Sequence, residues 1–432
     1  MMLLGMRGQS QGSGIHDLIN ATIDGDVAKV RDIIAQNPQV VNERSKELTC
    51  LHIAAHEGKL PIVKLLIEKK SDINATDDDG DTPLIVATGK QQTEVAEYLV
   101  RAGAQLDLKN DKGRTAIHNA AYTGQTTLIH ALIGRGCDVN VMDESGDTPL
   151  HDAIAEDHTA AAERILTSPK VDLTKTNERG FNPLHWSAFH GRAGIVEKIL
   201  QRNKSIIDST KEDGFTALHL AAINDHTDVA RVLIKQGASV NSKANNGSTP
   251  LHVACGECYI EPIQVLISAG ANVNASDNDG DTPLHLTMMQ NQTTDMFKAL
   301  IGEQGQSTDK RAQIATYLLQ HGADKEAENH AGLTPVEICT EEKLKSLVQN
   351  FAQINSPPSS SARNATASGF IQDVLCSSCL RQRANVIIVP CSHKTLCRAC
   401  CKNVRRCPLC GNDAIRKIGE DGKKIGSECV IQ

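Results

Sequence analysis

The sequence predicts an all-α solenoid of stacked helix pairs, followed by a small zinc-binding module near the C-terminus. Two observations lead to this prediction. A four-residue motif recurs at intervals of 33 or 34 residues through most of the first 350 residues, and eight of the 14 cysteines lie between Cys376 and Cys410. One short helix pair cannot bury its own apolar surface, so neighbouring pairs must stack against one another.

The recurring motif reads Thr-Pro-Leu-His in its fullest form and predicts the start of a helix. Thr offers an N-cap oxygen, Pro suits the first helical position, and Leu begins the buried face. A second amphipathic helix follows, as in "VARVLIKQGASVN" at 229–241. Glycines then end this helix in the left-handed conformation, as at Gly103, Gly136, Gly237 and Gly270. The copies begin at Thr49, Thr82, Thr115, Thr148, Asn182, Thr216, Thr249, Thr282 and Thr334.

This motif and spacing resemble the ankyrin repeat, which makes the predicted fold an all-α ankyrin-repeat solenoid. We expect about nine or ten repeats over residues 15–352, after a disordered N-terminus at 1–14. The distance between Thr282 and Thr334 is 19 residues too long, which places an insertion near 293–311 and the recovered second helix at 314–324.

Seven histidines occupy one position of the repeat, which raises the question of a metal site. They occur once per repeat and so lie about 10 Å apart in a stacked array. We therefore expect them to hydrogen-bond within and between repeats. They are His52, His118, His151, His185, His219, His252 and His285.

The ankyrin resemblance implies that a protein substrate or partner binds a concave face made of turn tips and first helices. Aromatic residues are only 3% of the chain, yet Phe181, Trp186 and Phe215 fall close together at positions that the repeat pattern does not fix. Aromatic side chains dominate interface energetics, so these three are candidate partner-binding residues. Packing between neighbouring repeats is the alternative.

The overall composition narrows the function classes. A net charge of −7 argues against a nucleic-acid partner. No window has the roughly 18 consecutive apolar residues that a membrane span needs, and the N-terminus lacks a secretory signal. We therefore expect no membrane insertion and a cytoplasmic location, where clustered cysteines indicate metal ligands rather than disulfides.

The cysteine-rich segment follows a Ser- and Pro-rich stretch at 353–372 that reads as a flexible linker. In the cysteine-rich segment, the spacing of seven cysteines and one histidine gives eight candidate ligands in four pairs. Zinc in structural sites takes four sulfur or nitrogen ligands, so eight ligands predict two Zn²⁺ ions and leave no open position for an activated water. The predicted ligands are Cys376, Cys379, Cys391, His393, Cys397, Cys400, Cys407 and Cys410.

The order of these ligands resembles the C3HC4 RING finger, placed here at 373–415. The resemblance implies that Cys376, Cys379, Cys397 and Cys400 hold one ion, and that Cys391, His393, Cys407 and Cys410 hold the other. It also implies recruitment of a ubiquitin-conjugating enzyme, with Pro408 in the contact and no catalytic residue in the RING itself. Three residues depart from the pattern of active RINGs: Ser377, Ser378 and Gly411.

Residues 416–432 form a predicted basic tail, and the compact spacing resembles RINGs that dimerise through tail residues. Ankyrin repeats followed by a C-terminal RING resemble the Mind bomb type of E3 ubiquitin ligase, as do segments such as "DESGDTPLHDAI" and "NERGFNPLHWSA". That resemblance implies a role in Notch-ligand ubiquitination and endocytosis. The family's ligand-recognition modules precede its repeats, whereas this chain begins almost at the first repeat and has one RING.

The sequence is therefore consistent with two functions. The first is a RING-type E3 ubiquitin-protein ligase whose repeats bind a substrate and whose RING binds a conjugating enzyme. The alternative is a non-catalytic ankyrin adaptor or scaffold in which the zinc module only dimerises. An autoubiquitination assay would separate the two.

Overall fold

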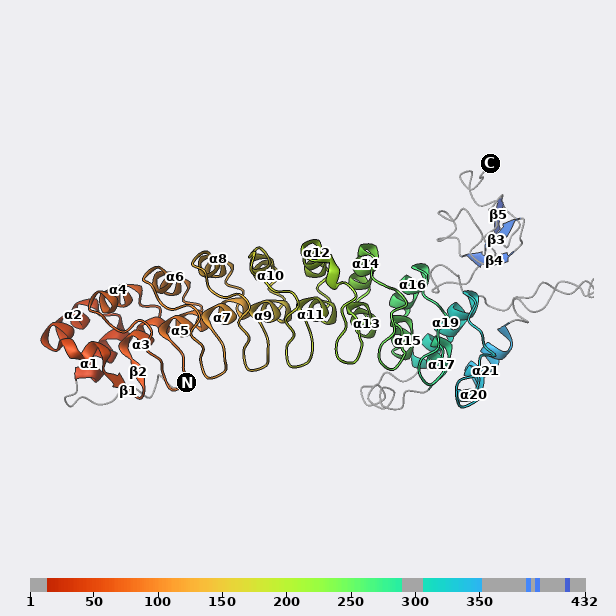
Figure 1. Cartoon of the computed structure of the whole chain (residues 1–432), viewed down its shortest axis with the longest axis horizontal. Coiled ribbons are helices and arrows are strands. Elements are labelled where there is room, and N and C mark those ends of the chain that lie inside the picture. The colour runs from red at the N-terminus through yellow and green to blue at the C-terminus, as the bar shows by residue number, and fades with distance from the viewer. Residues whose placement is uncertain (1–13, 290–305, 352–385, 390–392, 397–415, 420–432) are drawn as a thin grey trace, which may run out of the picture. The chain divides into compact units, whose positions relative to one another are not determined.

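The computed structural model describes three parts of the chain: residues 14–289, residues 306–351, and three strands near the C-terminus (Figure 1). For the strands only the backbone is described. Of the N-terminus predicted to be disordered, 1–14, only Gly14 is described, and it is helical. The linker at 353–372 and most of the predicted insertion lie outside the described residues. Contacts divide the chain into two compact units, residues 1–212 with 231–238 and residues 213–230 with 239–432.

The first unit consists of helix pairs arranged in two layers. The first helices of successive repeats pack side by side, as do the second helices. The first helices are α1 (Gly14–Asp24), α3 (Cys50–His56), α5 (Pro83–Gly89), α7 (Ala116–Tyr122), α9 (Pro149–Ala155) and α11 (Pro183–Phe189). The second helices are α2 (Val27–Gln36), α4 (Leu60–Glu68), α6 (Thr93–Arg101), α8 (Thr126–Gly134), α10 (Thr159–Leu166) and α12 (Ala193–Arg202).

Short elements complete this unit. They are two 3₁₀ helices, η2 (Pro38–Asn42) and η3 (Lys204–Ile206), and an antiparallel pair of two-residue strands, β1 (Arg44–Ser45) and β2 (Leu48–Thr49). Helix α14 (Thr227–Gln236) contributes residues to both units. Leu, Ile, Val and Ala side chains fill the space between the layers, and Leu66, Leu99 and Leu128 have no exposed surface.

The second unit repeats the helix pair and ends in a small sheet. Its helices are α13 (Ala217–Ile223), α15 (Pro250–Gly256), α16 (Ile260–Ser268), α17 (Pro283–Met288), α19 (Gln306–Gln320), α20 (Pro335–Ile338) and α21 (Glu342–Gln349). Helices α13, α15, α17 and α20 pack in sequence order. The three strands are β3 (Val386–Val389), β4 (His393–Leu396) and β5 (Arg416–Gly419), in the order β4-β3-β5 and antiparallel throughout.

The predicted helix starts are confirmed. Each Thr or Asn that opens the motif is the N-cap of a first helix, from Thr49 before α3 to Thr334 before α20. The predicted helix ends are confirmed as well, because Gly103 and Gly237 have φ of 93° and 95°. An L side chain rarely adopts such a φ, so glycine is the residue that ends these helices at least cost.

The helix after the predicted insertion starts earlier than the sequence indicates. We expected it at 314–324, whereas α19 begins at Gln306, so part of the stretch assigned to the insertion is helical. Arg311 explains why this part packs. Its side chain is only 3% exposed and its guanidinium lies 3.4 Å from a carboxylate oxygen of Glu341. A buried, paired arginine anchors the first turns of α19 to the repeat that follows.

The repeat histidines form a ladder of hydrogen bonds, as predicted. In the first copy, the Nδ1 atom of His52 accepts the backbone N–H of Thr49 at 3.3 Å, and Nε2–H donates to the backbone oxygen of Asp81 at 3.0 Å. The equivalent Nε2–oxygen distances in all seven copies lie between 2.8 and 3.2 Å. No group of metal-ligating side chains gathers within the described residues. The ladder is therefore structural.

This ladder makes the array sensitive to acid. Burial lowers the pKa of His219 to about 4, and a proton on its Nδ1 would face the backbone N–H of Thr216. The unfolded chain binds this proton near pH 6.5 and the folded chain does not, so stability is full above pH 6.5 and falls as pH decreases toward 4. From pH 7 to pH 5 we expect a loss of about 2 kcal/mol from this one histidine.

Urea unfolding followed by circular dichroism at pH 7 and pH 5 measures this loss. His219→Gln keeps a hydrogen-bonding side chain but cannot titrate, so it should lose less stability than the wild type over the same interval. Equal losses in the two proteins would show that His219 does not contribute to acid sensitivity.

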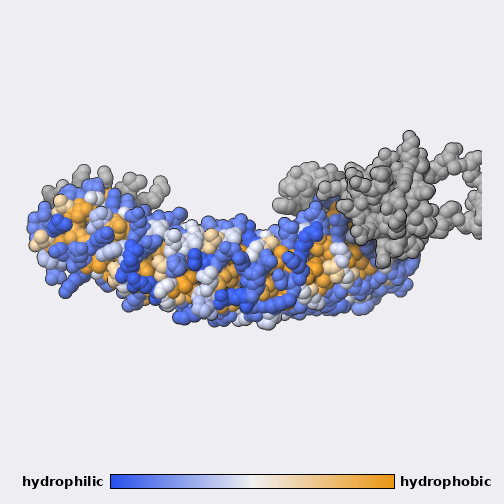
Figure 2. Space-filling model, turned by 90° about the horizontal axis from the view of Figure 1, so that it is seen from above, coloured by the Kyte–Doolittle hydropathy of each residue, from blue (hydrophilic) through white to orange (hydrophobic). Residues whose placement is uncertain are grey.

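The surface of the described residues is mostly polar. On the face that Figure 2 shows, hydrophobic residues lie in separate groups among hydrophilic ones. Tyr122 and Leu333 are the exposed large hydrophobic side chains of the described residues, at 49% and 41%. None of the described helices is long and apolar enough to cross a bilayer.

Candidate zinc centre and candidate binding face

The predicted zinc ligands lie almost entirely outside the described residues. The exception is His393, which opens strand β4 and pairs with Ile388 across a β3–β4 hairpin. Seven cysteines and one histidine form a donor set that fits structural zinc, which prefers thiolate and imidazole ligands. Pro408 also lies outside the described residues.

Strand β5 extends the sheet beyond the end that the sequence predicts for the zinc module. The sequence places that end at residue 415 and assigns residues 416–432, which include β5, to the basic tail. In the structure Arg416 pairs with Val389 and Lys417 with Ile388, so both basic residues belong to a strand of the module's sheet. The four residues "RKIG" show no alternation of apolar and polar side chains that would predict a strand, whereas in the structure they pair with β3.

No cysteine of the helical array gathers with other metal-ligating side chains among the described residues. Cys50 and Cys137 are buried free thiols, and burial raises the pKa of each to about 12. A thiol with so high a pKa is protonated at neutral pH and neither reacts nor binds zinc readily. They are core residues.

Trp186 and Phe181 pack inside the first unit. Each is only 7% exposed. The indole N–H of Trp186 donates to the backbone oxygen of His151, 3.1 Å away in the preceding repeat. The Trp186 ring stacks on Phe189 with centroids 5.7 Å apart and meets Phe181 edge-on at 5.1 Å. Trp186 therefore contacts the preceding repeat, as in the alternative to partner binding, and Phe181 packs against Trp186 within its own repeat.

Phe215 belongs to the second unit and is half-buried. Its ring stacks on that of His219 with centroids 5.1 Å apart. The three aromatic residues that the sequence groups together thus do not form one exposed set, although Phe215 remains a predicted partner contact.

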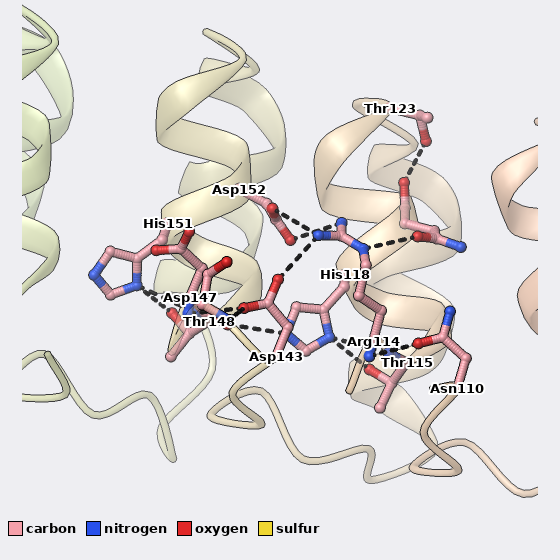
Figure 3. A network of polar contacts seen from close by, with 12 residues as sticks. Asn110, Arg114, Thr115, His118, Thr123, Asp143, Asp147, Thr148, His151 and Asp152 are labelled. Atoms are coloured by element: carbon pink, nitrogen blue, oxygen red, sulfur yellow. Dashed lines mark hydrogen bonds and ion pairs between the residues drawn. The ribbon is translucent and has the colours of Figure 1, made fainter. Parts of the chain in front are cut away.

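A polar network in the first unit, which the repeat pattern does not indicate, surrounds Arg114 (Figure 3). Arg114 lies just before α7, with one guanidinium nitrogen 3.1 Å from Asp143 and the other 3.0 Å from Asp152. Its Nε–H donates to the side-chain oxygen of Asn119 at 3.3 Å. Arg114 therefore links the turn and first helix of the next repeat to its own.

The carboxyl group of Asp152 has a strongly shifted pKa in this network. Its side chain is buried, and burial raises its pKa to about 7, although the charge and hydrogen bonds of Arg114 lower it. Asp152 follows the repeat histidine, a position where other repeats have apolar residues such as Ile53 and Leu220. A comparison of the repeats at this position would have revealed the buried charge.

Tyr122 adjoins the network and is exposed. The guanidinium of Arg114 lies 5.5 Å from the centre of its ring, within the range of a cation–π contact. The same position in the flanking repeats carries Gly89 and Ala155. The Tyr122 ring therefore lies between two small residues at the ends of the neighbouring first helices.

The stacked helix pairs, their N-cap threonines and their histidine ladder define a class of repeat protein, and comparison with known proteins identifies it. A model of ankyrin repeats matches residues 18–110, 102–177, 161–244 and 237–312. A model described as a C3HC4-type zinc finger, or RING finger, matches residues 372–417. The chain belongs to the ankyrin-repeat family and carries a C-terminal RING-type zinc finger.

The curated relatives match this chain only in part. The chain is 33% identical over 136 residues to E3 ubiquitin-protein ligase MIB2 of Gallus gallus, covering 27% of this chain and 14% of that protein. It is 29% identical over 87 residues to probable E3 ubiquitin-protein ligase XBOS31 of Oryza sativa subsp. japonica, covering 20% of each chain. The matched regions thus span at most a fifth of these relatives.

Among solved structures, the chain is similar to the ankyrin repeat domain of Bcl-3. The two are 27% identical with a TM-score of 0.45, and the match covers 48% of this chain and 95% of that one.

Proposed function

We propose that this protein is a RING-type E3 ubiquitin-protein ligase. The observation that supports the proposal most is the joint presence of an ankyrin array and a C3HC4-type zinc finger, together with partial matches to two relatives named as E3 ligases. In this proposal the array binds a protein substrate or partner. The zinc finger recruits a ubiquitin-conjugating enzyme.

The eight donors hold two Zn²⁺ ions in this proposal. Cys376, Cys379, Cys397 and Cys400 form one set, and Cys391, His393, Cys407 and Cys410 form the other. Zinc supplies a rigid fold and no open coordination position, because each ion is closed by four protein ligands. Pro408 contributes to the conjugating-enzyme contact, and no residue of the finger acts as a nucleophile. Transfer then depends on positioning a thioester that the conjugating enzyme carries.

The finer parts of the proposal rest on the sequence. A role in Notch-ligand ubiquitination and endocytosis rests on the Mind bomb resemblance, and a cytoplasmic location rests on composition. Dimerisation through the RING rests on the compact spacing of the ligands. Arg416 and Lys417 belong to strand β5 of the finger's sheet and are basic, whereas Gly411, one of the three departures from the pattern of active RINGs, carries no charge.

Autoubiquitination with a panel of conjugating enzymes tests the ligase proposal. We expect the full chain to form ubiquitin chains with at least one enzyme. Cys391→Ala should abolish them, because it removes a zinc ligand. The matched control is Cys401→Ser, which changes the one cysteine of the cluster outside the predicted ligand set and should leave activity unchanged. No chains with any enzyme would favour the adaptor, for which Ser377, Ser378 and Gly411 are the sequence arguments.

A further inference from the structure

Tyr122 carries an exposed aromatic ring. Exposed aromatic side chains contribute more binding energy than other residue types when a partner covers them. Tyr122 is 49% exposed, at the end of α7, while the other aromatic residues of its unit's central repeats are buried or half-buried. Its neighbours at the equivalent position, Gly89 and Ala155, are too small to cover it.

The guanidinium of Arg114 lies over the Tyr122 ring and is itself held by hydrogen bonds. That guanidinium donates to Asn119, Asp143 and Asp152 at 3.0–3.3 Å and is therefore held in place. The charge of this guanidinium is also offset by the carboxylate of Asp143, 3.1 Å away. A second cation approaching Tyr122 would thus meet little repulsion from Arg114.

The two repeats that flank Tyr122 are acidic. Their turns and first helices, residues 77–90 and 143–157, contain ten Asp or Glu and one Lys, whereas the same segment of its own repeat, residues 109–123, contains one Asp and three Lys or Arg. The three segments together carry a net charge of −7. Glu144 and Glu156 of this set are exposed. An aromatic ring with an acidic surround favours a cationic group by cation–π attraction and by charge complementarity.

We propose that Tyr122 is the centre of a docking surface for a basic segment of a protein partner, one that places an Arg or Lys side chain against the ring. The proposal deepens the proposed function and rests on it, since it names the chemistry of what the array captures. Tyr122 supplies the contact for the cation, and the acidic turns supply the attraction for the rest of the segment. Arg114 is a positioning residue that holds the ring.

Fluorescence anisotropy with the full chain tests this proposal. The probes are labelled peptides of about ten residues in which Gly alternates with Arg or with Glu. We expect the Arg peptide to bind and the Glu peptide not to bind. Tyr122→Ala should weaken binding of the Arg peptide about tenfold, because it removes the ring. Tyr122→Phe keeps the ring and should bind as the wild type does.

Leu333→Ala provides the matched control, because it removes the other exposed large hydrophobic side chain of the described residues and should not change binding. Failure of the wild type to bind the Arg peptide would overturn the proposal. Equal binding by wild type and Tyr122→Ala would also overturn it, since the peptide would then be held by charge elsewhere. Thermal unfolding of Tyr122→Ala within a few degrees of the wild type establishes that its fold is intact.

Autoubiquitination run in parallel separates this proposal from the ligase proposal. An inactive chain that still binds the Arg peptide through Tyr122 would refute the ligase and support the docking surface. An active chain without Tyr122-dependent binding would do the reverse.

Discussion

Chelation of zinc is expected to unfold the C-terminal finger while the helical array stays folded. The segment matched as a zinc finger, 372–417, has few apolar residues with which to form a core, so its folding free energy comes mainly from metal binding. Structural zinc contributes about 10–16 kcal/mol in small zinc modules. Its loss exceeds any stability that so short a segment could otherwise have.

Native mass spectrometry and limited proteolysis measure this effect together. We expect two Zn²⁺ per chain before chelation and none after it, with new cleavage sites confined to the finger. The array should be unaffected, because the described residues contain no cluster of metal-ligating side chains. Unchanged resistance to protease after complete metal removal would contradict the zinc-dependent fold.

Trp186→Ala is expected to destabilise the array by about 3–5 kcal/mol, the cost of removing a large buried aromatic side chain. The side chain is 7% exposed and stacks on Phe189. The change also leaves the backbone oxygen of His151 without the indole donor. The first loss removes packing within one repeat, and the second removes a contact with the preceding repeat.

Urea unfolding at neutral pH measures the change in free energy, with Tyr122→Ala as the control aromatic deletion at an exposed site. The control should lose much less stability than Trp186→Ala. A loss below about 1 kcal/mol for Trp186→Ala would show that the indole is not part of the core, and would return it to the partner-binding interpretation.

The local features of the array could be predicted from the sequence because each depends on residues close together in the chain. Thr49 caps its own helix, Gly103 ends one, and His52 bonds to a residue three positions earlier. The repeat then carries the same local chemistry through the chain. Stacking follows from the apolar faces that each helix pair leaves uncovered.

Features that depend on which residues of adjacent repeats meet could not be predicted in the same way. The indole N–H of Trp186 donates to the backbone oxygen of His151, 35 positions earlier in the preceding repeat. The Arg114–Asp152 pair joins residues 38 positions apart. Periodicity identifies the repeat position of each residue but not its exposure, so it does not decide between the two interpretations of Trp186 and does not single out Tyr122.

The candidate zinc centre was predicted from spacing and a family resemblance, and the sheet adds one feature to it. Strand β5 brings Arg416 and Lys417 into register with β3, which the short tail sequence does not indicate. The ligands other than His393 lie outside the described residues, so their pairing into two sets remains a prediction.

Single-turnover discharge of ubiquitin from a conjugating enzyme to free lysine is the most direct test of the central claim, that the finger activates a bound thioester by positioning it. The account predicts that the full chain accelerates discharge, that Cys391→Ala does not, and that Tyr122→Ala matches the wild type. Discharge at the same rate with and without the full chain, for every conjugating enzyme tested, would contradict it.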